Sequence, residues 1–251
     1  MIRLALLFLL AFSVPATAQR VIAGLSQNRI SISANFDGSE ILIFGAVKRD
    51  APASDPGDQG IIVTVEGPAQ AITVRRKERR ALIWVNDASA EIDRAPSFYT
   101  VNTSGPLSEI LLDRTDLHHR ITPPRAIRDI GAPLLDANAA FDEALIRIRE
   151  DQDLYQVNIG DVTVREGTLF STSVSLPANL VEGRYVARIY LMEGGRVVSR
   201  YETSIDVAKA GLERFLYTLA HDDPLIYGCL SLAIAIAAGW GASAAFRYVS
   251  S

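Results

Sequence analysis

The sequence predicts a mainly β protein: one or more immunoglobulin-like β-sandwich units with a helical insert, a cleavable N-terminal signal peptide and one C-terminal transmembrane helix. Three observations support this prediction. Short segments of alternating apolar and polar residues occur in both halves of the chain, a proline-interrupted stretch of helical periodicity separates them, and an apolar stretch lies near each end. The predicted segments are a signal peptide (1–18), an N-terminal β unit (19–104), a helical insert (105–157), a C-terminal β unit (158–208), a juxtamembrane amphipathic helix (209–223), a transmembrane helix (224–246) and a cytoplasmic tail (247–251).

The N-terminal segment MIRLALLFLLAFSVPATA has the features of a secretory signal. Arg3 precedes an apolar run, and Ala16 and Ala18 supply the small residues that signal peptidase requires. The run is shorter than the ~20 residues that cross a bilayer, so an uncleaved anchor is the weaker alternative. Cleavage would leave a mature chain beginning near Gln19, and the body of the chain would be exported.

The C-terminal stretch from Leu225 to Phe246 contains no charged residue. As a helix it would be about 33 Å long, enough to cross the apolar core of a membrane. Asp223 and Pro224 suit the first positions of such a helix. With an exported body and Arg247 in the short tail, the sequence predicts that the C-terminus is cytoplasmic.

Strand signals fill the first hundred residues after the signal. Alternation in RISISANF and EILIFGAV, separated by Asp37-Gly38, predicts a hairpin or two neighbouring strands. IIVTVEG, AITVRR, ALIWVN and SFYTVN continue the pattern. Four further strands are expected after residue 158, and Gly194-Gly195 predicts a tight hairpin between the last two.

Helical periodicity appears between and after these strands. LSEILLDRTDLHHRI and NAAFDEALIRIREDQDLY each carry an apolar stripe, and the prolines of TPPRAIRDIGAPLL predict an irregular crossover between them. A second short amphipathic helix is predicted just before the transmembrane segment, where Leu212, Phe215, Leu216 and Leu219 share one face. We expect it to lie on the membrane interface, with packing under the β domain as the alternative.

Composition excludes some classes of protein. The chain has 29 acidic and 25 basic residues, so its net charge of −4 does not favour binding to a polyanion. Its one cysteine, Cys229, lies in the predicted transmembrane segment, which excludes disulfides and thiolate metal sites from the body. No nucleotide-binding loop or nucleophile motif is present, so no cofactor, metal or catalytic residue is assigned and no enzyme is expected.

One charge cluster stands out against the acidic bulk. VRRKERRALIWVN contains the basic cluster, a name we keep for Arg75, Arg76, Lys77, Arg79 and Arg80. We interpret it as a solvated turn between two strands, whose charges discourage edge-to-edge pairing. The alternative is a contact with phospholipid headgroups, an acidic partner surface or a small anion. An exported body does not meet DNA, so nucleic acid is not an expected partner.

The other candidate residues are better explained by structural roles than by metal binding. His118 and His119 are adjacent and cannot bind one metal as residues four apart on a helix do, although Asp113 and Asp116 could pair with them. His221, with Asp222 and Asp223, suits a helix cap better than a divalent cation. Asp50, Asp55 and Asp58 lack the spacing of a calcium loop.

The apolar C-terminal segment carries a stripe of small residues. Ser231, Ala235, Gly239 and Ser243 recur every four positions, which allows another helix to approach closely. Alanine-rich segments produce such stripes by chance, so composition alone is an equally good explanation.

The whole mature chain resembles a family of alphaproteobacterial transmembrane proteins that has no assigned activity. The resemblance rests on ISANFDGSEILIFGAV, VRRKERRALIWVN, PSFYTV, FDEALIRIRED, LPANLVEGRYVARIYLMEGGRVV and GLERFLYTLAHDDPLIYGCLSLAIAIAAGW. It implies a single-pass protein of the bacterial inner membrane with a periplasmic body. Members are reported beside genes for permeases of the sulfite-exporter type, so the resemblance implies a membrane-protein partner, with such an anion permease as the first candidate.

The sequence therefore predicts a membrane-anchored periplasmic accessory or interaction protein, in contact with the lipid bilayer and with a membrane-protein partner. The alternative is a periplasmic small-anion-binding protein or enzyme with its site near the basic cluster and the helical insert.

Overall fold

The computed structural model describes residues 20–33, 36–48, 59–80, 82–127, 139–209 and 212–249. The predicted signal peptide, and Asp50, Asp55 and Asp58, lie outside these residues. The chain divides into two units, the first comprising Met1–Ile30 and Asp37–Val207 and the second Ser31–Phe36 and Ala208–Ser251. We call the described part of the first unit the body.

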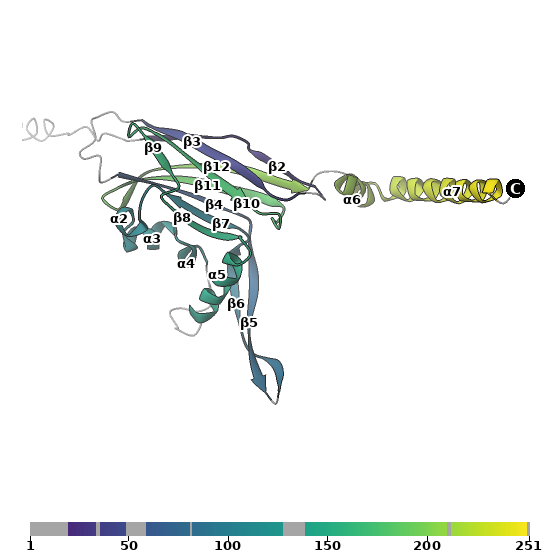
Figure 1. Cartoon of the computed structure of the whole chain (residues 1–251), viewed down its shortest axis with the longest axis horizontal. Helices are drawn as coiled ribbons and strands as arrows, with labels where there is room; N and C mark the ends of the chain where they lie inside the picture. The colour runs from purple at the N-terminus through teal and green to yellow at the C-terminus, as the bar shows by residue number, and fades with distance from the viewer. Residues whose placement is uncertain are drawn as a thin grey trace, which may run out of the picture. The chain divides into compact units, whose positions relative to one another are not determined.

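The body is mainly β and contains two principal sheets (Figure 1). The four-stranded sheet has the order β1-β3-β10-β9, and the six-stranded sheet has the order β2-β12-β11-β4-β7-β8. β7 and β8 run parallel. The strands of the first sheet are β1 (Arg20–Leu25), β3 (Ser39–Lys48), β9 (Thr163–Arg165) and β10 (Leu169–Leu176). Those of the second are β2 (Arg29–Ile32), β4 (Gln59–Glu66), β7 (Tyr99–Thr103), β8 (Tyr155–Ile159), β11 (Gly183–Glu193) and β12 (Arg196–Lys209).

The two sheets pack face to face over one apolar core. Ile41 and Ile43 of β3 and Ile189 of β11 are fully buried. The side chain of Asn102, on β7, crosses to the other sheet, where its amide donates to Thr172 Oγ1 at 2.8 Å and to the Ser173 carbonyl at 2.9 Å. Because a buried amide is costly unless it is bonded, these bonds fix how the sheets align.

Strands from the two halves of the sequence share both sheets. The sequence predicted separate β units at 19–104 and 158–208, but β3 pairs with β10 and β4 pairs with β11. β2 and β3, expected as hairpin or neighbouring strands, belong to different sheets. Alternation shows which face of a strand is apolar but not which distant strand it pairs with. The Gly194-Gly195 hairpin is confirmed, since both glycines have positive φ between β11 and β12.

Helices cover the outer face of the six-stranded sheet (Figure 1). They are α2 (Leu107–Ile110), α3 (Asp113–His119), α4 (Pro123–Ala126) and α5 (Ala139–Glu150). The hydroxyl of Tyr99, on β7, donates to the carbonyl of Ile121 at 2.8 Å, and Ile121 is fully buried. The turn glycine Gly195 accepts a bond from the Thr115 hydroxyl at 2.8 Å. Helical periodicity indicated α2, α3 and α5, whereas α4 lies in the stretch that was predicted to be an irregular crossover. Backbone-directed bonds hold this layer on the sheet.

A long hairpin, β5 (Ala69–Arg80) and β6 (Ile83–Pro96), forms its own two-stranded sheet and extends away from the two principal sheets (Figure 1). Its base is anchored, because Val74, Ala90 and Ile92 are buried. From Arg75 to Ser89 no described residue is buried. We call residues 75–89 the arm.

The second unit contains α6 (Leu212–Asp222) and α7 (Pro224–Val249). Pro224 starts α7, where a proline loses no helical hydrogen bond, and the N–H of Tyr227 donates to the Asp223 carbonyl at 3.1 Å. Within the described chain, Pro224–Ser243 is long and apolar enough to cross a membrane, and none of it is buried against protein. A helix is present at 212–222 as the sequence predicted.

Candidate functional site

The basic cluster lies in a strand and not in the turn that the sequence suggested. Arg75, Arg76, Lys77, Arg79 and Arg80 all belong to β5 and are exposed, and the turn follows at Leu82. Its pairing with β6 has a register shift between Arg76 and Lys77, which leaves Asp87 as an extra residue in β6. A strand can carry this many charges here because no described residue of the chain buries either face of the arm.

The acidic side chains of the arm are paired on one of its faces. Asp87 forms ion pairs with Arg80 and with Arg76, the latter at 3.8 Å. Glu78 lies 3.6 Å from Arg80. Since successive residues of a strand point to opposite faces, Arg76, Glu78 and Arg80 share one face.

The other face of the arm carries uncompensated positive charge. Arg75, Lys77 and Arg79 alternate along β5 and share this face, and none makes an ion pair among the described residues. Trp84 of β6 stands opposite Arg79 in the register, so it points to the same side. The cluster is therefore divided into a neutralised face and a cationic face.

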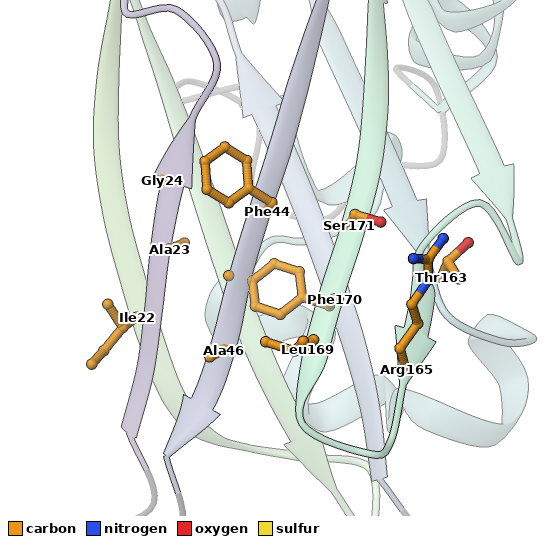
Figure 2. Close-up of a pocket in the computed structure, with 11 residues that line it drawn as sticks. Ile22, Ala23, Gly24, Phe44, Ala46, Thr163, Arg165, Leu169, Phe170 and Ser171 are labelled. Atoms are coloured by element: carbon orange, nitrogen blue, oxygen red, sulfur yellow. The ribbon is translucent and has the colours of Figure 1, made fainter.

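A second candidate surface is an apolar hollow on the outer face of the four-stranded sheet (Figure 2). It has a volume of about 610 Å³ and is open to solvent. Strand register places Ile22 and Leu169 on either side of Ala46, and Gly24 and Ser171 on either side of Phe44. Its lining residues are Ile22, Ala23, Gly24, Phe44, Gly45, Ala46, Thr163, Arg165, Leu169, Phe170 and Ser171.

Small residues shape this hollow. Gly24 faces the Phe44 ring across the strand pair, and a Cβ there would lie 3.4 Å from the ring. Gly45 points inward, where a Cβ would lie 2.4 Å from the Ile22 carbonyl oxygen and 2.6 Å from the Phe170 ring. The rim is polar at one edge, because Thr163 and Arg165 of β9 stand beside Ser171 and Leu169. The hollow suits an apolar group with a polar neighbour.

The histidine pair has a structural setting. The His118 and His119 rings lie 4.7 Å apart, and His119 lies 6.0 Å from the Tyr190 ring of β11. Burial lowers the pKa of His119, and the positive charges of His118 and Arg200 lower it further. Asp116 does not pair with them: its carboxylate accepts bonds from the N–H groups of Ile121 and Thr122, both at 2.9 Å. This bonding ends α3 and starts the next turn.

Buried tyrosines support the helix-covered face. Burial raises the pKa of Tyr99 well above its usual value, and it also raises the pKa of Tyr155 and Tyr190. Beside them, Glu66 accepts bonds from Arg188 at 2.5 Å and from Arg94 at 3.3 Å. Each charge has a partner of opposite sign, as expected for a structural network.

The small-residue stripe lies on α7. Ser231, Ala235, Gly239 and Ser243 are exposed, and the Ser231 hydroxyl donates to the Tyr227 carbonyl at 2.8 Å. A side chain that bonds back to its own helix keeps the surface smooth. In α6, His221 stacks on Tyr217 at 4.1 Å, and its Nδ1 lies 2.9 Å from the Tyr217 carbonyl oxygen. Within the described ranges, no three His, Cys, Asp or Glu residues are grouped to hold a metal.

A β body followed by one exposed apolar helix defines the class of a single-pass membrane protein. The chain belongs to the family described as "Putative transmembrane protein (Alph_Pro_TM)", which matches residues 20–248. This confirms the family resemblance found from the sequence. No curated protein matches the chain.

Proposed function

We propose that this protein is a membrane-anchored accessory protein that binds a second membrane protein and acts without catalysis. Its body lies in the periplasm, α7 crosses the inner membrane once, and the C-terminal tail is cytoplasmic. Membership of a transmembrane family and the uncovered apolar helix support the anchoring. The flanking charges of α7 support the orientation, because Arg247 follows the span while Asp222 and Asp223 precede it.

The apolar hollow is the observation that carries the binding role. Phe44, in the middle of β3, is 46% exposed, and Leu169, at the start of β10, is 53% exposed. Ile22 and Leu42 extend the same apolar surface over β1 and β3. A contiguous apolar patch of this kind on a folded body marks a surface that a partner covers. Burial of half-exposed Leu, Ile and Phe side chains stabilises a complex by roughly 1 kcal/mol each.

We propose a membrane protein as the partner because such a protein could contact two surfaces of the chain, the apolar hollow and the small-residue stripe of α7. The hollow can accept an apolar segment outside the bilayer, and the small-residue stripe of α7 lets a transmembrane helix pack closely. Two contacts on one partner act together at high effective concentration. Family resemblance makes a permease of the sulfite-exporter type the first partner to test.

Site-specific photo-crosslinking in native membranes tests the proposal. We expect a crosslinker at Phe44 and one at Gly239 to capture the same membrane protein. A crosslinker at Val198, an apolar residue of β12 that is 41% exposed on the other sheet, is the matched control and should capture nothing specific. Capture of different proteins from Phe44 and Gly239, or of none, contradicts the proposal.

The alternative function, binding of a small anion, would use the basic cluster and not the apolar hollow. All five residues of the basic cluster are exposed on the arm, so an anion bound there would remain largely hydrated. Thermal unfolding of the protein with added sulfite or sulfate separates the two functions. A midpoint that rises with either anion favours the alternative, because only ligands of the folded state stabilise it.

A further inference from the structure

The tip of the arm exposes three consecutive large apolar residues. Leu82 is 82% exposed, Ile83 is 63% exposed and Trp84 is 67% exposed. They begin two residues after Arg80, the last residue of the basic cluster, at the end of the arm farthest from its buried base (Figure 1). Hairpin tips in water usually carry Gly, Asn or Asp. An apolar tip on a projecting hairpin is therefore built to enter a less polar environment.

The cationic face indicates what that environment contains. Arg75, Lys77 and Arg79 lie two residues apart, so their charges are spaced by roughly 7 Å along the strand. The arm has acidic residues, but Asp87 and Glu78 are engaged with Arg76 and Arg80. Three cations are thus left for an external anion, in a row that leads to Trp84.

A row of cations leading to an apolar tip with tryptophan matches the chemistry of a phospholipid surface. Lys and Arg bind lipid phosphates, Trp prefers the headgroup level, and aliphatic side chains enter the acyl boundary. An acidic protein partner would satisfy the cations but would not explain the exposed Leu82 and Ile83. A closed apolar pocket in a protein would explain the tip but not the charges.

The same chain also has a segment that can cross a bilayer. Because α7 anchors the body to a bilayer, docking of the arm on that bilayer is intramolecular and needs no further loss of free translation. We propose that the arm docks on the anionic phospholipid surface of the bilayer that α7 spans, with Leu82, Ile83 and Trp84 at the headgroup level and the cationic face on lipid phosphates. A second attachment point would restrict how the body tilts on its anchor.

Tryptophan fluorescence of the full chain tests this proposal. The sequence has two tryptophans, so Trp240→Phe leaves Trp84 as the sole reporter. This variant is placed in lipid nanodiscs of phosphatidylcholine alone, or with about a third phosphatidylglycerol to provide the anionic surface. In the anionic discs we expect blue-shifted Trp84 emission and quenching by brominated lipids.

Charge variants of the arm make the test specific. Arg75→Gln, Lys77→Gln and Arg79→Gln together should lower the ratio of docked to free arm by about fivefold for each cation removed, and quenching should fall to the level in neutral discs. The matched control is Arg76→Gln with Arg80→Gln and Asp87→Asn, which changes the neutralised face and should keep most of the quenching. Equal melting midpoints show that the variants are folded.

Three outcomes would overturn the proposal. Trp84 that stays in water in the anionic discs shows that the arm does not reach its own bilayer. Equal quenching in neutral and anionic discs shows that headgroup charge does not direct docking. Equal losses in the two charge variants show that the cationic face has no special role.

Discussion

The two sheets of the body share one core but differ in what covers their outer faces. Over the six-stranded sheet lie α2–α5, the buried Ile121 and the paired charges of Glu66 and Arg188. Over the four-stranded sheet lies no described helix, and Phe44 and Leu169 face solvent. The same chain therefore covers one apolar face with its own residues and leaves another open. The open face is the one we expect a partner to cover.

The largest effect should come from the covered face. Ile121→Ala leaves a cavity between the helix layer and the sheet, so we expect a loss of about 2–5 kcal/mol in the free energy of unfolding. Phe44→Ala on the open face should cost less than about 1 kcal/mol, because the ring is already half exposed. Denaturant unfolding of the full chain in detergent measures both. Equal losses would show that the open face is packed in solution.

Two glycines of the open sheet should respond differently. Gly45→Ala pushes a methyl group against the Ile22 carbonyl and the Phe170 ring, so strands β1 and β3 must shift. We expect this shift to lower the free energy of unfolding by about 1–3 kcal/mol. Gly24→Ala meets only the edge of the Phe44 ring at 3.4 Å and should be close to neutral for folding. The melting temperatures of the two variants check this order. A neutral Gly45→Ala would contradict the strand packing described for the hollow.

Binding should depend on the open face more than folding does. Phe44→Glu puts a charge in the hollow, and we expect it to weaken partner binding at least about tenfold while the melting temperature changes little. Val198→Glu, an apolar-to-acidic change on the other sheet, is the control. Co-purification from membranes compares the two variants. Equal binding by both would remove the hollow from the interface.

Alkaline pH should lower the free energy of unfolding, because Tyr99 under the helix layer is buried. Burial raises the pKa of Tyr99 in the folded state above the usual 10.0, so the unfolded chain loses this proton first. The resulting stability is fully present below pH 10.0 and falls above it, by up to about 1.4 kcal/mol per pH unit. Tyr99→Phe should make the alkaline decline less steep. An unchanged slope would place the titration in other tyrosines.

The smallest effect should come from His119. Its pKa is lowered in the folded state, so the unfolded chain binds a proton first as the pH falls below 6.5. Stability should therefore decline as the pH drops from 6.5 through the lowered pKa and then level off. His119→Gln should flatten this decline in urea unfolding at several pH values. A steeper decline in the variant would contradict the assigned direction.

Local patterns in the sequence predicted individual strands and turns better than they predicted which strands pair with one another. The strand signals after residue 158 and the Gly194-Gly195 pair predicted β11 and its turn, because both signals depend on neighbouring residues only. The pairings of β3 with β10 and of β4 with β11 could not be predicted, since many apolar strand faces fit one another. The continuous apolar run ILIFGAV could have indicated the hollow, but it was used only to predict a strand. Ile41 and Ile43 fill the core while Leu42 and Phe44 face outward, so both sides of β3 are apolar.

The basic cluster shows the same limit. Its charges predicted exposure correctly, but their placement on a strand depends on β6, and their division into two faces depends on the extra residue Asp87. Neither could be obtained from counting charges.

The turn glycine Gly195 has a consequence for how the polypeptide is completed. Leu112 and Thr115 both donate to its carbonyl, and its missing side chain leaves room for Leu112. The ribosome makes residues 107–126 before this late hairpin, so the bonds of Leu112 and Thr115 to Gly195 cannot form until the hairpin has been made. Both sheets likewise wait for β10 and β11. Because these contacts join residues that are far apart in the sequence, we expect the body to fold slowly and mostly after synthesis is complete. The chain therefore stays unfolded, and able to pass through a membrane, for longer than a chain that folds through local contacts.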